Sequence, residues 1–453
     1  MSVFRYESFA TDAGRGLLTC NYSLDGREFA ERVTLPPGPR WDTPAAHAAA
    51  RLIFLLAGVS YYKTAAPPAI DLGDTTLTER ERDFLRDFYV NGLAEFAYRN
   101  GITITPTVSS MPPAPSMPPA PSMQLAPTIP LERVVGANDT PEKGRRQALV
   151  PFGGGIDSIV TLEHIRQRAD VALFVVSRPG DTYDAIERPA AVAGLPIIRA
   201  SRLIDPQLLR SAENGFLNGH VPVTGIISAI AVLAAVLGER DAVVMSNEWS
   251  ASVPTLEFDG RPVNHQYSKS AQFEAALRDV LTETAAPMPE YFSWLRDRTE
   301  LWVGHEFASL ARYHRTFRSC NKAFYTEKAR RLDHWCGECD KCCFIDLILA
   351  PFLPASELGE IFAVASEPLG KPELREKFRA LLGAGTKPFE CVGEATECRA
   401  AVLLAAARAD RASSPLLQAL ATEVRSWPDT PTAIDAEQML APVGGNFVPA
   451  EYT

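Results

Sequence analysis

A short apolar segment that runs into three consecutive glycines, and then into a helical pattern, constrains the fold of this chain most. Residues 147–152 (Gln-Ala-Leu-Val-Pro-Phe) have the length and apolar character of a buried strand. After the glycines, Ile159, Leu162 and Ile165 recur at helical spacing. A strand, a glycine turn and a helix in direct succession are typical of the first unit of an α/β sheet.

Three more strand-like segments follow, at residues 171–176, 195–199 and 242–245, with helical stretches between them. Strands that alternate with crossover helices predict a parallel, doubly wound sheet, so the expected fold class is α/β. Ligands of such sheets bind beyond the carboxyl ends of the strands. The glycines follow the first strand directly, and we therefore expect them at a ligand site.

A proline-rich segment, residues 104–130, precedes this sheet. The run Ser-Met-Pro-Pro-Ala-Pro at residues 110–115 is repeated at 116–121 and, in a decayed form, at 122–127. Such proline density favours extended chain over a packed core, so we expect a spacer, with a partner-binding segment as the alternative.

Composition and periodicity divide the chain into four parts. In the first of them, a helix is predicted to begin near Thr78, where Thr-Glu-Arg-Glu resembles a capping signal. The predicted parts are an N-terminal α+β unit (1–103), the proline-rich linker (104–130), a doubly wound core (131–318) and a mostly helical C-terminal unit (319–453).

The charge balance narrows the class of partner. The 453 residues carry a formal net charge of −10, whereas nucleic-acid-binding domains usually present a basic stripe. The longest apolar run, residues 223–237, is shorter than the roughly 18 residues that a membrane span needs, so it predicts a buried helix. The N-terminus shows no export signal. We expect a cytoplasmic protein with neither nucleic acid nor membrane as partner.

The glycine segment itself, residues 153–158 (Gly-Gly-Gly-Ile-Asp-Ser), has the chemistry of a phosphate site. Glycines let the backbone approach a phosphate, and the following helix offers free N–H groups to the anion. Asp157 is expected to help hold Mg²⁺, and the Ser158 hydroxyl to bond a phosphate oxygen. The spacing is neither that of a Walker loop nor GxGxxG. The alternative is a tight turn without a ligand. The expected nucleotide contacts from this segment are Gly153, Gly154, Gly155, Asp157 and Ser158.

Five of the eight cysteines fall between Cys320 and Cys343. Three of them form two overlapping Cys-x-x-Cys steps, and Cys320 upstream completes a set of four. Tetrahedral zinc takes four thiolates at about 2.3 Å, so a structural Zn²⁺ site is predicted. A redox or iron–sulfur role and ordinary reduced cysteines are the alternatives. The predicted ligands are Cys320, Cys336, Cys339 and Cys342.

Two polar runs add candidate contacts. Asn247 follows a predicted strand and should face the ligand crevice, while His265 and Lys269 belong to a dense run of donors directly before a helix. The alternative is a purely structural role for that run, in which Ser268 or Ser270 caps the helix. We expect Asn247 and Lys269 to contact ATP or substrate.

Cys391 lies in an unusual loop, residues 387–394, between glutamates and ahead of a helix. A reactive thiol and a buried structural cysteine fit this setting about equally.

Residues 153–158 resemble the Ser-Gly-Gly-x-Asp-Ser loop of the PP-loop ATP pyrophosphatases, with Gly153 in place of the first serine. This resemblance implies a PP-loop (HUP-like) core that binds ATP and cleaves it between the α and β phosphates, so that the substrate becomes an adenylate. The cysteine cluster resembles the zinc site of the PP-loop deazaguanine synthases, in which an upstream cysteine joins Cys-Gly-x-Cys-x-x-Cys.

Four segments together, 153–158, 263–274, 336–343 and 387–394, are similar to one family, the ATP-dependent UDP-N-acetyl-muramoyl-L-alanyl-L-glutamate epimerases (MurL type) of peptidoglycan synthesis. The resemblance implies that ATP and Mg²⁺ adenylate the terminal L-Glu of a UDP-muramoyl dipeptide, which is then inverted to D-Glu. It also implies that the N-terminal unit lies on the substrate side, and that a following ligase of the same pathway is a partner.

Inversion at the glutamate Cα through a planar carbanion needs proton carriers on opposite faces. The candidates are His265, Cys391 and Cys398. The competing functions are another PP-loop adenylating enzyme, such as a deazaguanine-type synthase, a tRNA-thiolating enzyme or an amide ligase, and a nucleotide sensor without catalytic activity. The acidic net charge disfavours a tRNA substrate.

Overall fold

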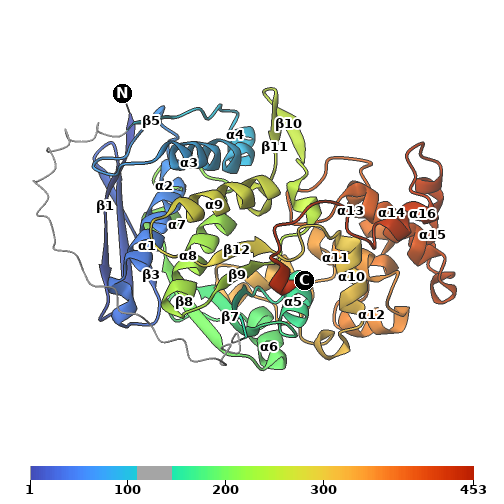
Figure 1. Ribbon diagram of the computed structural model, residues 1–453. Coiled ribbons are helices and arrows are strands. Elements are labelled where there is room, and N and C mark those ends of the chain that lie inside the picture. Colours follow the sequence, from blue (N-terminus) through green and yellow to red (C-terminus); the bar gives the residue numbers. More distant parts are fainter. Residues whose placement is uncertain (1, 110–144) are drawn as a thin grey trace, which may run out of the picture.

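The computed structural model describes residues 2–109 and 145–453, and the proline repeats of the expected linker lie outside these ranges. One ten-stranded sheet runs through the described chain, in the order β12-β9-β6-β7-β8-β3-β2-β1-β4-β5 (Figure 1). Most neighbouring strands are parallel, and helices cover the sheet, so the α/β fold class is confirmed.

The strands from β12 to β8 are all parallel and carry the predicted alternation of strand and helix. The four strands expected from the sequence are present, and the third begins and ends later than expected. The parallel strands are β6 (Gln147–Pro151), β7 (Asp170–Ser177), β8 (Ile197–Leu203), β9 (Ala242–Met245) and β12 (Glu290–Ser293).

The N-terminal strands extend this same sheet. β8 pairs antiparallel with β3, and Arg202 on β8 forms an ion pair with the fully buried Glu31 on β3. The units expected at 1–103 and 131–318 thus share one sheet. The strands of this half are β1 (Val3–Asp12), β2 (Leu17–Leu24), β3 (Arg27–Thr34), β4 (Ala69–Asp71) and β5 (Thr107–Ser109).

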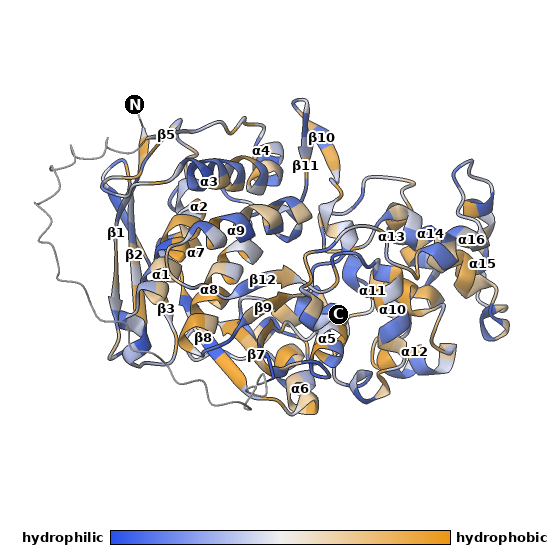
Figure 2. Ribbon diagram, viewed as in Figure 1, coloured by the Kyte–Doolittle hydropathy of each residue, from blue (hydrophilic) through white to orange (hydrophobic). Residues whose placement is uncertain are grey.

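β7 shows why the sequences of the parallel strands are continuously apolar. Leu173 and Val175 point into one hydrophobic core, while Ala172 and Phe174 point into the other. Successive side chains of a strand alternate between its faces, so a strand covered on both faces is apolar throughout. The orange interior of Figure 2 follows the sheet and the helix faces against it.

The helices begin where local chemistry predicts. The Thr78 side chain caps α3 (Glu79–Gly92) and forms the expected capping box with Glu81. α8 (Val223–Leu237), the longest apolar run, is a buried core helix, as predicted. The stretch Pro44–Tyr62, covering α1 (Pro44–Ala57) and α2 (Val59–Tyr62), is long and apolar enough to cross a membrane, but 78% of it is buried inside the protein.

Residues beyond β12 are mainly helical, as expected, and form the red and orange end of Figure 1. A two-stranded hairpin, β10 (Leu256–Phe258) and β11 (Arg261–Val263), stands apart from the main sheet. The remaining helices are α4 (Ala94–Asn100), α5 (Ile156–Ile165), α6 (Asp184–Ala193), α7 (Pro206–Leu209), α9 (Ala271–Glu283), α10 (Glu300–Ala308), α11 (Asp340–Leu349), α12 (Ala355–Ile361), α13 (Arg375–Leu381), α14 (Ala395–Ala406), α15 (Pro415–Arg425) and α16 (Ala433–Gln438).

Candidate active site

The glycine segment lies where the strand order of the sheet reverses. β6 is flanked by β7, the next strand in the chain, and by β9, which is reached only after β8. At such a switch point the connections leave on opposite faces, which opens a crevice beyond the carboxyl ends of the strands. Gly153 and Gly154 follow one residue, Phe152, after the end of β6, and Gly155 is the N-cap residue of α5.

Gly154 has a structural reason to be glycine. Its φ is +77°, and a Cβ there would lie 2.1 Å from the carbonyl oxygen of Ala185 on α6. A side chain at Gly153 would meet nothing within 4 Å, so that glycine is not required by packing. The loop therefore combines one glycine that the fold demands with one that leaves the backbone accessible.

A cavity of about 430 Å³ opens at this loop. This volume is within the range of small-molecule sites. Pro151, Val176 and Met245, at the ends of β6, β7 and β9, form part of its floor. The cavity collects most of the predicted contacts: Gly153, Gly155, Asp157, Ser158, Asn247, Lys269 and Cys391 all line it.

The half-buried carboxylate of Asp157 and the buried carboxylates of Glu248 and Glu300 meet beside the loop. Ligand oxygens of Asp157, Glu248 and Glu300 lie within 4.8 Å of one another. Asp157 Oδ1 and Glu300 Oε2 are buried and have no hydrogen-bond partner among the described residues. Burial and the charge of Glu248 raise the pKa of Asp157 to about 6, and burial and Asp157 raise that of Glu300 well above its usual range. Orphaned oxygens of this kind suit a bound cation.

The half-buried Lys269 and the buried Lys341 face these carboxylates. The Lys269 Nζ lies 3.2 Å from Cys391 Sγ, and Lys341 Nζ donates to the Cys391 carbonyl. The positive charges of both lysines favour the ionised form of Asp157. The cavity wall therefore carries alternating charges of both signs, as sites for phosphates and metal ions do.

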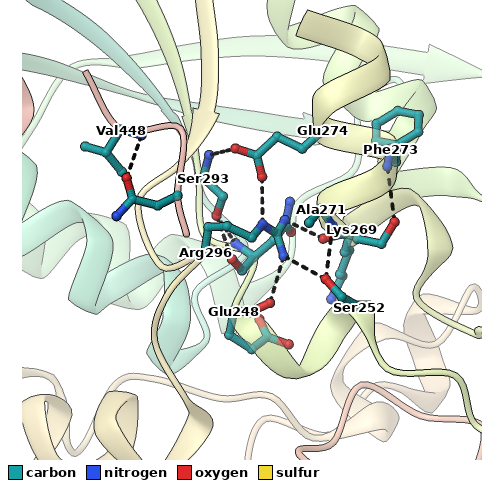
Figure 3. A network of polar contacts seen from close by, with 12 residues as sticks. Glu248, Ser252, Lys269, Ala271, Phe273, Glu274, Ser293, Arg296 and Val448 are labelled. Carbon is teal, nitrogen blue, oxygen red and sulfur yellow. Dashed lines mark hydrogen bonds and ion pairs between the residues drawn. The ribbon is translucent and has the colours of Figure 1, made fainter. Parts of the chain in front are cut away.

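Arg296 fixes the backbone on which this wall is built (Figure 3). Its guanidinium bonds the buried carboxylate of Glu274 at 2.8 Å and donates to the carbonyls of Glu248 and Lys269 at 2.9 and 2.6 Å. Ser293 on β12 exchanges hydrogen bonds with the backbone of Asn247. The segments after β9 and before α9 are thereby held against the end of β12.

Cys391 lines the cavity and lies among positively charged side chains. Burial would raise the pKa of its thiol, but Lys269, together with His265 and Lys341, lowers it to about 6. His265 bonds the sulfur with one ring nitrogen and the buried Glu95 with Nδ1. Burial would lower the pKa of His265, but the bonds to Cys391 and Glu95 raise it to about 9. These shifts favour the thiolate of Cys391 and the imidazolium of His265.

His220 lies behind this pair, with its ring centroid 4.4 Å from that of His265. Burial and the positive His265 lower the pKa of His220 to about 4, so it stays neutral. Ligand atoms of Glu95, His220 and His265 lie within 4.8 Å of one another. Within this group His265 Nδ1 and Glu95 Oε2 form a direct hydrogen bond of 2.5 Å, while His220 Nδ1 lies 3.9 Å from Glu95 Oε2.

Cys398 is not part of this arrangement. It is fully buried on α14 and does not line the cavity. Burial and the neighbouring Glu397 raise the pKa of its thiol above the usual range. The structure thus brings together two of the three residues expected to carry protons, His265 and Cys391.

The four cysteines expected to bind zinc converge from two segments. Their Sγ atoms all lie within 4.8 Å of one another, and Cys339 and Cys342 are separated by 3.4 Å. Cys339 is the N-cap residue of α11, Cys342 lies in its first turn, and Cys320 comes from a separate loop. Cys343, left over from the set, is buried in the core. The donor set and its spacing fit a tetrahedral metal site.

Comparison with known proteins decides the family. The model of the MurL N-terminal domain matches residues 1–294, and that of the MurL C-terminal domain matches residues 316–434. The chain belongs to the MurL family. The resemblance noted in the four sequence segments is therefore confirmed.

Three curated members of the MurL family match over nearly the whole chain, and each is named UDP-N-acetyl-alpha-D-muramoyl-L-alanyl-L-glutamate epimerase. The protein of Salinispora tropica is 37% identical and covers 100% of this chain and 95% of its own length. The protein of Xanthomonas oryzae pv. oryzae is 35% identical and covers 99% of this chain and 95% of its own length. The protein of Micromonospora sp. is 36% identical and covers 100% of this chain and 97% of its own length. No solved structure matches the chain.

The site of this MurL-family chain also contains residues that the sequence did not single out. Glu300 and Lys341 lie on helices far along the chain from the glycine loop, and Glu95 comes from the N-terminal half. Nothing in the local sequence of Glu300 or Glu95 distinguishes them from surface charges, whereas Lys341 lies inside the cysteine segment 336–343 and was overlooked because the thiols are the stronger signal there. Glu248 is different, because it follows Asn247 after a predicted strand and could have been included on position alone.

Proposed function

We propose that this MurL-family chain is an ATP-dependent epimerase that inverts the terminal glutamate of a UDP-N-acetylmuramoyl-L-alanyl-L-glutamate in peptidoglycan precursor synthesis. The names of the three relatives supply the substrate and the epimerase activity. One observation supports the adenylation route: a single cavity at the switch point is lined by the accessible glycine loop, by Asp157 of the carboxylate cluster and by Cys391, the neighbour of His265.

Adenylation answers a physical problem. Removing the Cα proton beside an ionised carboxylate would place a carbanion next to an existing negative charge. An acyl-adenylate has no such charge, and its carbonyl oxygen can accept the developing negative charge from nearby donors. The PP-loop character of the core belongs to this proposal, and so does the release of AMP and pyrophosphate.

In this proposal ATP lies along the glycine loop. The backbone of Gly153, Gly154 and Gly155 approaches the phosphates, and the N-terminus of α5 faces them. Asn247 and Lys269 line the same cavity and are the proposed side-chain contacts. The Ser158 hydroxyl donates its hydrogen to the Gly155 carbonyl. To donate to an ionised phosphate oxygen instead, the hydroxyl would have to rotate away from that carbonyl. Without rotation, its oxygen could only accept a hydrogen bond from a protonated phosphate.

Asp157, Glu248 and Glu300 are the residues that would hold Mg²⁺. The fit rests on the two buried carboxylate oxygens that have no partner among the described residues. A bound Mg²⁺ would neutralise phosphate charge as pyrophosphate departs. The chain itself contributes Lys269 and Lys341, which face both the carboxylates and the cavity.

His265 is the proposed proton carrier. Its Nδ1 is held by Glu95, which leaves the other ring nitrogen directed at Cys391 and the cavity wall. A fixed imidazole is the side chain best suited to proton transfer near neutral pH. Cys391 is the second reactive group, and Cys398 is left out because it is buried away from the cavity.

The N-terminal half contributes to the proposed site through α4. Glu95 on this helix orients His265, and Arg99 lies 4.9 Å from the ring of Phe389, in the loop that carries Cys391. We propose that residues 1–103 form the substrate side, with the UDP-sugar bound there. Residues 107–109 of the expected linker belong to the main sheet as β5, which corrects the start of the expected linker. The segments 131–318 and 319–453 keep their proposed roles as ATP-binding core and helical unit.

We further propose that Cys320, Cys336, Cys339 and Cys342 hold a structural Zn²⁺. The proposal is supported by the mutual approach of the four thiols, although none of them lines the cavity. A cytoplasmic location and a following ligase as partner complete the proposal, since the substrate is a nucleotide-linked precursor.

The function is tested in deuterated water with ATP, Mg²⁺ and the UDP-muramoyl dipeptide. We expect AMP and pyrophosphate, one deuterium at the glutamate Cα, and D-glutamate after acid hydrolysis. AMP without inversion would favour the second candidate, another PP-loop adenylating enzyme such as a deazaguanine-type synthase or amide ligase. ATP binding without AMP would refute both.

A further inference from the structure

The Cys391 sulfur has the surroundings of a nucleophile. Lys269 lies 3.2 Å away, and His265 bonds it from another side while Glu95 orients the imidazole. A nucleophile, a base within hydrogen-bond reach and a third group that orients the base form the arrangement found in enzymes with a covalent step. Cys391 also lines the same cavity as Gly155 and Asp157, where an adenylate would form.

A thiolate held between two cations is better suited to attack than to proton abstraction. Lys269 and His265 stabilise the anion and so make it a weak base, whereas a Cα–H bond demands a strong one. The same stabilisation makes the sulfur a good leaving group later, because a low-pKa thiol departs readily. Proton transfer and covalent attack can then be divided between His265 and Cys391.

We propose that Cys391 Sγ attacks the acyl-adenylate and carries the glutamyl group as a thioester while its Cα is inverted. This inference rests on the proposed adenylating function and deepens it. It gives Cys391 a role distinct from that of His265, and it explains why a lysine and a histidine both contact one sulfur.

The step balances without an oxidant or reductant. The sulfur electron pair forms a C–S bond, the bond from the acyl carbon to the AMP oxygen breaks, and AMP leaves with that electron pair. Acylation removes one of the two negative groups that keep His265 protonated, so the imidazole can pass its proton to solvent and then accept one from Cα, while a solvent proton enters Cα from the opposite face. After inversion, water adds to the thioester and the C–S bond breaks. The thiolate is restored, the product leaves as a carboxylate, and both protons of the water are released.

The test is a single turnover of the full-length enzyme with ATP, Mg²⁺ and excess enzyme over UDP-muramoyl dipeptide, quenched in acid at successive times. We expect the peptide that contains Cys391 to gain transiently the mass of the whole UDP-muramoyl dipeptide minus one water. Neutral hydroxylamine should remove this mass. A turnover that yields D-glutamate without labelling Cys391 at any time would overturn the thioester.

Two variants separate this inference from the function on which it rests. Cys391→Ala should keep substrate-dependent exchange between ATP and labelled pyrophosphate, which also shows that it is folded, but lose D-glutamate formation by roughly 10³-fold or more. The matched control is Cys20→Ala, since Cys20 is buried in β2 and does not line the cavity. It should behave as wild type.

The exchange of pyrophosphate and the entry of deuterium at Cα distinguish a failure of the adenylation proposal from a failure of the thioester proposal. If wild-type enzyme shows no exchange with pyrophosphate, adenylation itself is wrong and the thioester falls with it. If exchange persists in Cys391→Ala and Cα deuterium still enters at the wild-type rate, adenylation stands and the thioester is refuted.

Discussion

Replacing Lys269 by glutamine should raise the pKa of the Cys391 thiol. The thiol pKa is about 6, and the attraction of the Lys269 charge is the largest single effect that lowers it. At the Nζ–Sγ distance of 3.2 Å, two unit charges attract by about 5 kcal/mol at an effective dielectric constant of about 20, and by about 1.3 kcal/mol in water. One pKa unit corresponds to about 1.4 kcal/mol, so the expected rise is roughly one to four units.

The pH dependence of alkylation by iodoacetamide measures this pKa, because only the thiolate reacts. Mass spectrometry of the peptide that contains Cys391 separates its reaction from that of the other cysteines. The midpoint in wild-type protein should lie near pH 6. A rise of about two units would reduce the thiolate fraction near pH 7 from about nine-tenths to about one-tenth, and slow alkylation about tenfold.

Lys377→Gln is the control, since this lysine is exposed on α13, pairs with Asp340 and does not line the cavity. Its midpoint should stay at the wild-type value. A Lys269→Gln midpoint within half a pH unit of wild type would contradict the electrostatic argument, and would leave His265 as the group that sets the thiol pKa.

Four further changes test other parts of the site. Glu95→Gln removes a carboxylate that favours the imidazolium, so the pKa of His265 should fall below its wild-type value of about 9. The part of the pH–rate profile that depends on His265 should then move to lower pH. An NMR titration of His265 with the same midpoint as in the wild type would contradict this. Glu300→Gln should raise the Mg²⁺ concentration for half-maximal AMP formation by about tenfold or more, which is about 1.4 kcal/mol of binding. Cys339→Ser should abolish the stoichiometric zinc expected from elemental analysis and lower the melting temperature, because metal binding contributes folding energy; less than about half an equivalent of zinc in the wild type would refute the site. Gly154→Ala should cost about 1–3 kcal/mol in denaturant unfolding, since its positive φ and the neighbouring backbone both exclude a side chain.

Local sequence patterns were sufficient for the elements that hold the glycine loop. β6, the turn and α5 follow from apolar runs and glycines that are adjacent in the chain, and the capping box at Thr78 from four residues. The pairing of β8 with β3 was not predictable in this way. It joins segments about 170 residues apart, and their register depends on contacts such as that of Arg202 with the buried Glu31.

The same distinction applies to the site. Asp157, Lys269 and Cys391 each belong to a motif that stands out in the sequence, and the fold brings all three to one cavity. Glu300 and Glu95 have no such motif, because a glutamate in a helix is ordinarily a solvated surface charge. Only burial at the meeting point of distant helices distinguishes them, and burial is a property of the tertiary structure.

Arg296 links the fold to the chemistry of this cavity. A buried arginine that paired only with Glu274 would be expensive, since desolvation offsets much of the attraction of a buried ion pair. Its remaining donors, however, bond the carbonyl of Glu248, a member of the carboxylate cluster, and that of Lys269, which lines the cavity. The arginine therefore fixes the backbone from which a carboxylate and an ammonium group of the site project. Rigid placement of opposite charges is what an adenylating site needs, because donors and cations contribute most when they do not have to reorganise during the reaction.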